Sequence, residues 1–244
     1  MKILIVIPAR FKSSRFPGKP LKKILNKELI LWVLETCHKL QNKKIEVVVA
    51  TESYKIFNFI KRKGMNAIMT SKNCLTGTDR VAEVSKKIKA KLYLNVQGDE
   101  PLINVKDIKK IINAKISHPD KIICGFTNVK RDENVENKNI PKIIMNKKNE
   151  LIYISRAVIP SSKNGKIRDK TFFKQVCIYA FNQLELKKFY SKNKTPLEKE
   201  EDIEIIRFLE KGFKVKMIKL NSNNLAVDTI KDIKKIEKFL KRNV

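Results

Sequence analysis

Cysteine and histidine are scarce in this 244-residue chain. Its four cysteines, Cys37, Cys74, Cys124 and Cys177, lie far apart and form no C-x-x-C pair, and only two histidines accompany them. A thiolate or imidazole metal site is therefore not expected. A chain of this length can bury enough surface to fold without disulfide bonds, so we expect isolated, reduced thiols.

Long hydrophobic runs are also missing. No apolar run reaches the roughly 18 residues that a membrane-spanning helix needs. The apolar start at 2–7 stops at Pro8 and leads into Arg10, without the small-residue cleavage site of a signal peptide. We therefore expect a buried first strand and a cytoplasmic protein without membrane insertion.

Arginine is rare relative to lysine, since it accounts for nine of the 54 basic residues in a chain of formal net charge +29. Such a charge invites a nucleic-acid-binding interpretation. However, arginine is the residue favoured for bidentate contacts to phosphates and bases, and the lysines are spread over nearly every segment. We favour a solvated lysine coat with no nucleic acid as partner, and expect the charge to favour anionic substrates.

The first half of the chain alternates apolar runs rich in β-branched residues with segments of helical periodicity. The expected strands are at 2–7, 45–50, 66–69 and 91–96, and the expected helices at 28–41, 52–63, 79–89 and 105–116. This order predicts a mainly parallel α/β sheet with helices on both faces.

From about residue 121 the regular alternation of strands and helices ends. Further strands are expected at 121–129, 142–146, 151–155, 174–181 and 213–219, and further helices after Asn182, at 197–211 and after Thr229. We predict a single domain over residues 1–244, with a small mixed β extension at about 130–180.

Three basic residues, Arg10, Arg15 and Lys19, lie within ten positions directly after the first strand. Serine hydroxyls, two prolines and one glycine accompany them. Loops at this edge of a parallel sheet bind ligands, and fixed donors with positive charge suit a polyphosphate. The segment is not a Walker loop, and no G-x-G-x-x-G fingerprint occurs in the chain. The alternative is a basic surface loop.

Two carboxylates follow the strand expected at 91–96, in the run Gln97-Gly98-Asp99-Glu100. At the carboxyl end of a sheet they could hold Mg²⁺, which bridges protein carboxylates to substrate phosphates. The alternative is an ordinary turn. Thr76–Arg80 lies at the start of a predicted helix and could contact a nucleotide, and Val227–Thr229 precedes the last predicted helix. Both could be simple N-caps.

Taken together, these segments resemble the 3-deoxy-manno-octulosonate (Kdo) cytidylyltransferase family, the CMP-Kdo synthetases. The resemblance runs from about residue 2 to 240 and is carried by six ordered motifs. The longest are I-P-A-R-F-K-S-S-R-F-P-G-K-P-L at 7–21, T-G-T-D-R-V-A-E-V at 76–84 and N-V-Q-G-D-E-P-L-I at 95–103, and shorter ones lie at 153–160, 196–198 and 227–229.

The resemblance implies a nucleotide-diphospho-sugar transferase-like fold and a magnesium-dependent nucleotidyltransferase. In such enzymes the anomeric hydroxyl of the sugar attacks the α-phosphorus of CTP, and pyrophosphate leaves. The expected product is CMP-Kdo, for lipopolysaccharide synthesis. The resemblance further implies a homodimer formed through the β extension.

The same resemblance implies the roles of individual residues. Arg10, Arg15, Lys19 and Asp99 would act in catalysis, the first three on the triphosphate. The residues expected around the nucleotide are Ala9, Arg10, Thr78, Asp79, Arg80 and Gln97, those facing the sugar are Arg156, Gln175, Tyr179 and Glu201, and the magnesium ligands are Asp99 and Asp228.

The sequence departs from the family pattern on the sugar side, at Gln175, Lys199 and Ile205. The nucleotide-side motifs are intact, so CTP is expected as the donor while the acceptor stays open. The alternative to Kdo is another acidic acceptor, such as an amino-substituted Kdo, a nonulosonic acid or a phosphonate. The R-F-P-G-K-P run at 15–20 argues against a sialate-type enzyme.

Overall fold

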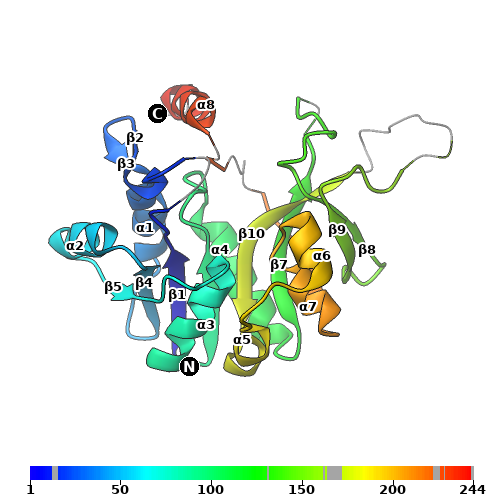
Figure 1. Ribbon diagram of the computed structural model, residues 1–244, viewed down its shortest axis with the longest axis horizontal. Coiled ribbons are helices and arrows are strands. Elements are labelled where there is room, and N and C mark those ends of the chain that lie inside the picture. Colours follow the sequence, from blue (N-terminus) through cyan, green and yellow to red (C-terminus); the bar gives the residue numbers. More distant parts are fainter. Residues whose placement is uncertain are drawn as a thin grey trace.

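The computed structural model describes residues 1–12, 16–130, 132–161, 163, 172–221, 226–227 and 229–242. Its main strands are β1 (Ile3–Pro8), β4 (Ile45–Thr51), β5 (Ala67–Met69), β6 (Leu92–Val96), β7 (Ile122–Asn128), β10 (Phe173–Phe181) and β11 (Val215–Lys219). They form one sheet in the order β11-β7-β10-β6-β1-β4-β5 (Figure 1).

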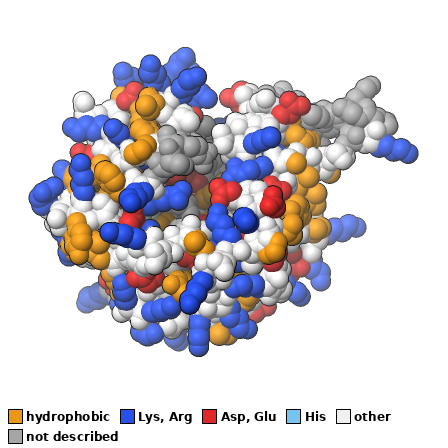
Figure 2. All heavy atoms as spheres, in the orientation of Figure 1, with side chains coloured by type: hydrophobic (Ala, Val, Ile, Leu, Met, Phe, Trp, Pro, Cys, Tyr) orange, Lys and Arg blue, Asp and Glu red, His pale blue; other side chains and the backbone are white. Residues whose placement is uncertain are grey.

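The helices lie on both faces of this sheet (Figure 1). They are α1 (Leu29–His38), α2 (Tyr54–Arg62), α3 (Gly77–Lys87), α4 (Val105–Ser117), α5 (Gln183–Phe189), α6 (Pro196–Glu201), α7 (Ile206–Glu210) and α8 (Ile230–Arg242). Among the described residues, every helix is too short or too polar to span a bilayer. Lys and Arg side chains are scattered over many elements of the face in Figure 2 instead of gathering in one patch.

Most neighbouring strands of the sheet are parallel. β1 pairs in parallel with β4 and β6, β4 with β5, and β11 with β7. β10 is antiparallel to both of its neighbours, β6 and β7. The prediction of a mainly parallel sheet covered on both faces is confirmed. Within the stretch at about 130–180, the hairpin of β8 (Lys142–Met145) and β9 (Leu151–Ser155) is attached through β10, which itself is a central strand.

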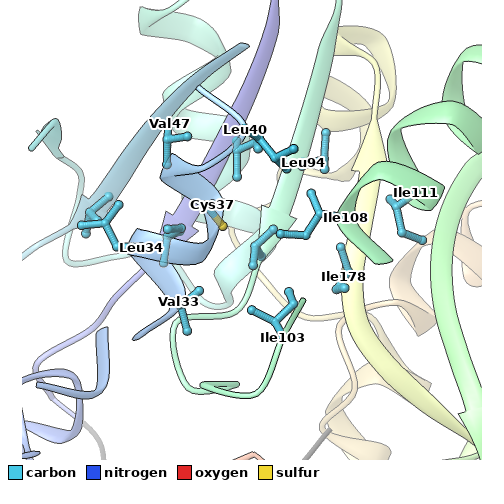
Figure 3. Packing of buried hydrophobic residues seen from close by; sticks show 14 of the residues in the cluster. Val33, Leu34, Cys37, Leu40, Val47, Leu94, Ile103, Ile108, Ile111 and Ile178 are labelled. Carbon is cyan, nitrogen blue, oxygen red and sulfur yellow. The ribbon is translucent and has the colours of Figure 1, made fainter. Parts of the chain in front are cut away.

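Two hydrophobic cores lie on the two faces of the sheet. β1 is buried along its whole length because its alternate side chains enter different cores: Ile5 belongs to one and Leu4 to the other. Figure 3 shows the first core, where Cys37 of α1 and Ile108 of α4 pack near Leu94 of the sheet. Side chains from α3, α5 and α7 fill the second core.

The predicted helix starts are confirmed where a side chain caps them. The Asn104 side chain accepts a hydrogen bond from the Asp107 N–H at the start of α4. Asn182 and Glu185 form a reciprocal capping box at the start of α5. Caps of this kind satisfy backbone N–H groups that the first helical turn leaves without partners.

The prediction of one helix over 197–211 is wrong. The structure has two short helices there, α6 and α7, because Asp202 adopts a left-handed conformation with φ 49° and ψ 46°. Aspartate tolerates this conformation better than most residues. The Asp202 carbonyl accepts a hydrogen bond from Arg156 Nη2 at 3.0 Å, a tertiary contact that helical periodicity cannot reveal.

A small hairpin, β2 (Lys23–Ile24) and β3 (Lys27–Glu28), was not expected from the sequence. Leu25 and Asn26 form its two-residue turn, both with positive φ. The Leu25 N–H donates a hydrogen bond to the Glu237 carboxylate of α8 at 3.1 Å. α8 thereby lies above the carboxyl ends of the parallel strands (Figure 1).

A buried charge network joins α3 to α6 and α7. The Arg207 side chain is 0% exposed and donates from Nε and Nη2 to the two carboxylate oxygens of Glu198, both at 2.6 Å. Its Nη1 atom donates to Asp79 at 2.7 Å. Two carboxylates therefore share one guanidinium, and the pairing fixes the start of α3 relative to the α6–α7 segment.

We expect Arg207→Met to lower the free energy of unfolding by about 3–5 kcal/mol, because it leaves two buried carboxylates without their cation. Urea denaturation checks this value. Lys194→Met is the matched control, since it removes the exposed pair Lys194–Asp202 and should cost no more than about 1 kcal/mol. Equal losses in the two variants would contradict the assignment.

Candidate functional site

A cleft of about 730 Å³ opens at the carboxyl ends of β1 and β6. One group of lining residues comes from the segments after these strands and from the start of α3: Pro8, Ala9, Arg10, Lys19, Gly77, Arg80, Gln97 and Asp99. A second group comes from the segments around β9 and α6: Lys138, Asn139, Arg156, Lys194, Asp202 and Glu204. The cleft thus brings together motifs that are far apart in the sequence.

The loop after β1 is anchored at both ends. The Ala9 N–H donates to the Ala50 carbonyl at 2.9 Å, which continues the β1–β4 pairing by one residue. The Gly18 N–H donates to the Phe11 carbonyl at 2.9 Å, and Gly18 has φ 69°, a conformation that glycine adopts without strain. Arg10 and Lys19 of this loop line the cleft, whereas Arg15 lies outside the described residues.

Lys19 connects three segments at the edge of the cleft. Its Nζ atom lies 2.5 Å from Asp99 Oδ2 and 2.8 Å from the Val227 carbonyl oxygen. The Val227 N–H in turn donates to the Asp99 carbonyl at 2.9 Å. The segment before α8 is therefore held against the turn that carries Asp99. Asp228, which follows Val227, lies outside the described residues.

Asp99 and Glu100 point in different directions. The Asp99 side chain is 29% exposed and lines the cleft. Glu100 is buried, and its carboxylate accepts a hydrogen bond from the Cys177 N–H at 3.3 Å. Burial, together with the charge of the adjacent Asp99, raises the pKa of Glu100 to about 8. Of the two carboxylates, Asp99 is the one that the cleft presents to a ligand.

The start of α3 forms one wall of the cleft, but two of its predicted nucleotide residues face inward. The Asp79 carboxylate pairs with Arg207 and accepts a hydrogen bond from the N–H of Thr76, the N-cap of α3. The Thr78 hydroxyl accepts a hydrogen bond from the Asn95 amide at 3.1 Å. Both side chains are buried and neither lines the cleft. Their contacts position the helix start. The Thr78 backbone N–H donates to Glu204 at 2.9 Å.

The remaining predicted nucleotide residues line the cleft. They are Ala9, Arg10, Arg80 and Gln97. A Cβ atom at Gly77 would lie 3.0 Å from the Gln97 side chain and 3.2 Å from Pro8, so a larger residue there would displace these neighbours slightly. The structure therefore brings together residues from all three nucleotide-side motifs.

Arg156 belongs to the second group of lining residues and is held by several hydrogen bonds. Its guanidinium donates to the carbonyl oxygens of Glu201, Lys138 and Asp202. The Glu201 carboxylate accepts from the Arg156 N–H at 2.8 Å and from the Ser155 hydroxyl at 2.5 Å. Glu201 thus fixes the backbone of Arg156. It is not among the residues that line the cleft.

Two other predicted sugar-facing residues lie in the protein interior. Tyr179 is buried, with its ring stacked on Phe181 at a centroid distance of 6.0 Å. The Gln175 amide donates to Cys124 Sγ at 3.6 Å. Neither residue lines the cleft in this structure.

Glu204 is a cleft residue that was not expected from the sequence. Its carboxylate accepts hydrogen bonds from the Thr78 N–H and, at 3.1 Å, from the Gln97 amide, so it joins the two halves of the cleft wall. Burial raises the pKa of Glu204 above its usual range. No sequence signal marked this residue, because the left-handed turn at Asp202 that sets its direction interrupts an apparently continuous helix.

Comparisons with known proteins agree with this arrangement. The family model described as cytidylyltransferase matches residues 4–233. A 3-deoxy-manno-octulosonate cytidylyltransferase of Fusobacterium nucleatum is 36% identical, over 100% of this chain and 98% of the relative. Proteins of the same name from Protochlamydia amoebophila and, as a mitochondrial form, Arabidopsis thaliana are 34% and 35% identical; each match covers 98% of this chain and 94% and 83% of the relative.

Solved structures are similar over the whole chain. A CMP:2-keto-3-deoxy-manno-octonic acid synthetase in complex with CTP superposes with a TM-score of 0.88 at 31% identity, covering 100% of both chains. A cytidylyltransferase of Leptospira borgpetersenii has a TM-score of 0.64 at 20% identity, over 99% of this chain and 87% of the other, and supports the fold alone. On the family match and these full-length relatives, the chain belongs to the cytidylyltransferase family.

Proposed function

We propose that the protein is a Kdo cytidylyltransferase, which couples CTP to the anomeric hydroxyl of Kdo and releases pyrophosphate, giving CMP-Kdo for lipopolysaccharide synthesis. This proposal rests on the set of residues that line one cleft. The basic loop after β1, Asp99 and the hydrogen-bonded Arg156 all line it. The relatives named above share this activity in their names, and the solved relative was in complex with CTP.

The arrangement suits transfer of a nucleotidyl group between two anionic substrates. Arg10 and Lys19 would bind the triphosphate and stabilise the charge that develops as pyrophosphate leaves. Arg156 would bind the carboxylate of the acidic sugar, because its guanidinium is already oriented by three carbonyl oxygens. Holding both substrates in one cleft aligns the anomeric hydroxyl with the α-phosphorus.

The position of the sequence departures supports Kdo as the acceptor. Ile205 is buried in the core, Gln175 is bonded to a buried thiol, and Lys199 is exposed outside the cleft. None of the three is among the residues that line the cleft. These three departures therefore give no reason to expect an acceptor other than Kdo. Another acidic acceptor is the alternative, and an acceptor panel distinguishes the two.

We also propose that Mg²⁺ binds at Asp99 and Asp228. A carboxylate facing a phosphate site is a suitable hard ligand, and the ammonium group of Lys19 already occupies the position of a cation beside Asp99. No group of three or more His, Cys, Asp or Glu in the described part of the chain could hold a metal ion. The other ligands would come from phosphate oxygens, water and Asp228. When bound, the ion would neutralise phosphate charge.

A homodimer is the expected assembly, formed through the β8–β9 hairpin. Ile152 of β9 and Leu197 of α6 are large apolar residues that are 58% and 45% exposed, and Ile152 lies on the hairpin that the proposal makes the contact surface. We expect light scattering to give twice the chain mass. The variant Ile152→Glu should shift the protein toward the monomer, whereas a monomeric wild type would contradict the proposal.

A cytoplasmic location stays a prediction from the sequence.

The first activity test concerns the donor and the acceptor. With Kdo and Mg²⁺, pyrophosphate release should be fastest with CTP in a comparison with UTP, ATP and GTP, because the nucleotide-side motifs are intact. Faster turnover with ATP or GTP would contradict the cytidine assignment. With CTP fixed, turnover of Kdo should exceed that of an amino-substituted Kdo, a nonulosonic acid or a phosphonate; the reverse order would favour the alternative acceptor.

The second test concerns the loop after β1. We expect Lys19→Ala and Arg15→Ala each to lower kcat by a factor of roughly 10²–10³, the effect of losing one preorganised charge-stabilising donor. Lys19→Ala should also lower the melting temperature modestly, because Lys19 joins Asp99 to the Val227 carbonyl, so kcat is compared at a temperature where both variants are folded. Near-normal turnover in both variants would show that the loop is only a basic surface.

The third test concerns the metal ligands. Asp99→Asn and Asp228→Asn should each abolish magnesium-dependent turnover and weaken Mn²⁺ binding measured by electron paramagnetic resonance. Glu100→Gln is the matched control and should bind Mn²⁺ as the wild type does, because Glu100 is buried beside the Cys177 backbone. A larger loss of Mn²⁺ binding in Glu100→Gln than in Asp99→Asn would show that Glu100 is the metal ligand and Asp99 is not.

A further inference from the structure

Glu52 lies where three parallel strands end together. It follows β4, which is flanked by β1 on one side and β5 on the other. The register places Pro8 beside Ala50, and the Thr70 N–H donates to the Thr51 carbonyl at 2.8 Å. Glu52 therefore sits between the loop that leaves β1 and the segment that leaves β5.

The two carboxylate oxygens of Glu52 have different partners. Oε1 accepts a hydrogen bond from the Phe11 N–H at 2.8 Å, one residue after Arg10. Oε2 lies 2.9 Å from Arg80 Nη2, and the two side chains are only 10% and 5% exposed. One buried carboxylate thus contacts both the predicted phosphate loop and the start of α3.

The Arg80 guanidinium is oriented by hydrogen bonds and lies in ion-pair distance of Glu52 Oε2, without a hydrogen bond to it. Its Nη1 atom donates to the Thr70 hydroxyl and, at 3.4 Å, to the Ser71 carbonyl, while Nη2 faces Glu52. Arg80 lines the cleft, yet its charge is already balanced by Glu52. A buried cation compensated in this way stabilises the shape of the wall more than it attracts phosphate.

We propose that Glu52 is a positioning residue for the nucleotidyl transfer reaction. One of its oxygens fixes the backbone that presents Arg10, and the other holds Arg80 against the cleft wall and cancels its charge. This inference rests on the proposed function, because it assumes that CTP binds beside Arg10. Glu52 itself is not among the residues that line the cleft, so it would act through Arg10 and Arg80.

Two substitutions separate these two roles. Glu52→Ala removes both contacts, so CTP should bind at least tenfold more weakly and kcat should fall by roughly 10², the scale of a misplaced catalytic group. Glu52→Gln keeps a carbonyl oxygen for the Phe11 N–H but leaves the charge of Arg80 uncompensated. Inorganic pyrophosphate should therefore bind several-fold more tightly to Glu52→Gln than to the wild type in calorimetric titrations.

Two further variants test the mechanism. In the Arg80→Met background, Glu52→Gln should no longer tighten pyrophosphate binding, because the charge it exposes is gone. Glu185→Gln is the matched control: Glu185 pairs with Lys115 at 2.7 Å, equally buried but outside the cleft lining. It should lower the melting temperature while leaving the dissociation constants of CTP and pyrophosphate within twofold of the wild type.

The results distinguish this inference from the proposed function. If Glu52→Ala binds CTP as the wild type does, or if Glu52→Gln binds pyrophosphate with unchanged or weaker affinity, Glu52 has only a structural role and the inference is wrong. A wild-type protein that neither binds CTP nor releases pyrophosphate with Kdo would instead overturn the proposed function.

Discussion

The parallel pairing of β1 with β4 and β6 is the constraint on which the cleft depends. Parallel strands end at the same edge of a sheet, so the residues that follow them must share one surface. Here those residues are Ala9 and Arg10 after β1, Glu52 after β4, and Gln97 after β6. No contact between their side chains is needed to bring them together. The side-chain contacts then determine which way each group faces.

Charge compensation determines what the cleft offers to a ligand. Arg80 is balanced by Glu52, and Lys19 is balanced by Asp99. The large positive charge of the chain is mostly on exposed lysines that solvent screens, and says little about the site itself. Arg156 differs from Arg80 and Lys19, since its guanidinium is oriented by carbonyl oxygens that leave its charge in place.

The sequence predicts the strands and most helices well, because the strands are continuous apolar runs and the helix starts carry capping side chains. It also predicts that the loop after β1 and the Asp99 turn share one edge of the sheet. It does not predict the break at Asp202, which depends on a contact with Arg156 that is 46 residues distant in the chain. Asp79 and Tyr179 show the same limit: their motif positions are clear, but burial by Arg207 and Phe181 determines where their side chains point.

The antiparallel strand β10 has a consequence for how the chain folds. It lies between β6 and β7 in the sheet but comes about 50 residues after β7 in the sequence. During synthesis, β1, β4, β5 and β6 can pair as soon as residue 96 is available, whereas the edge of β6 has no strand beside it until residue 181 has been made. An unpaired edge of this kind can pair with another chain. The nascent protein therefore depends on late insertion of β10 to avoid association before it is complete.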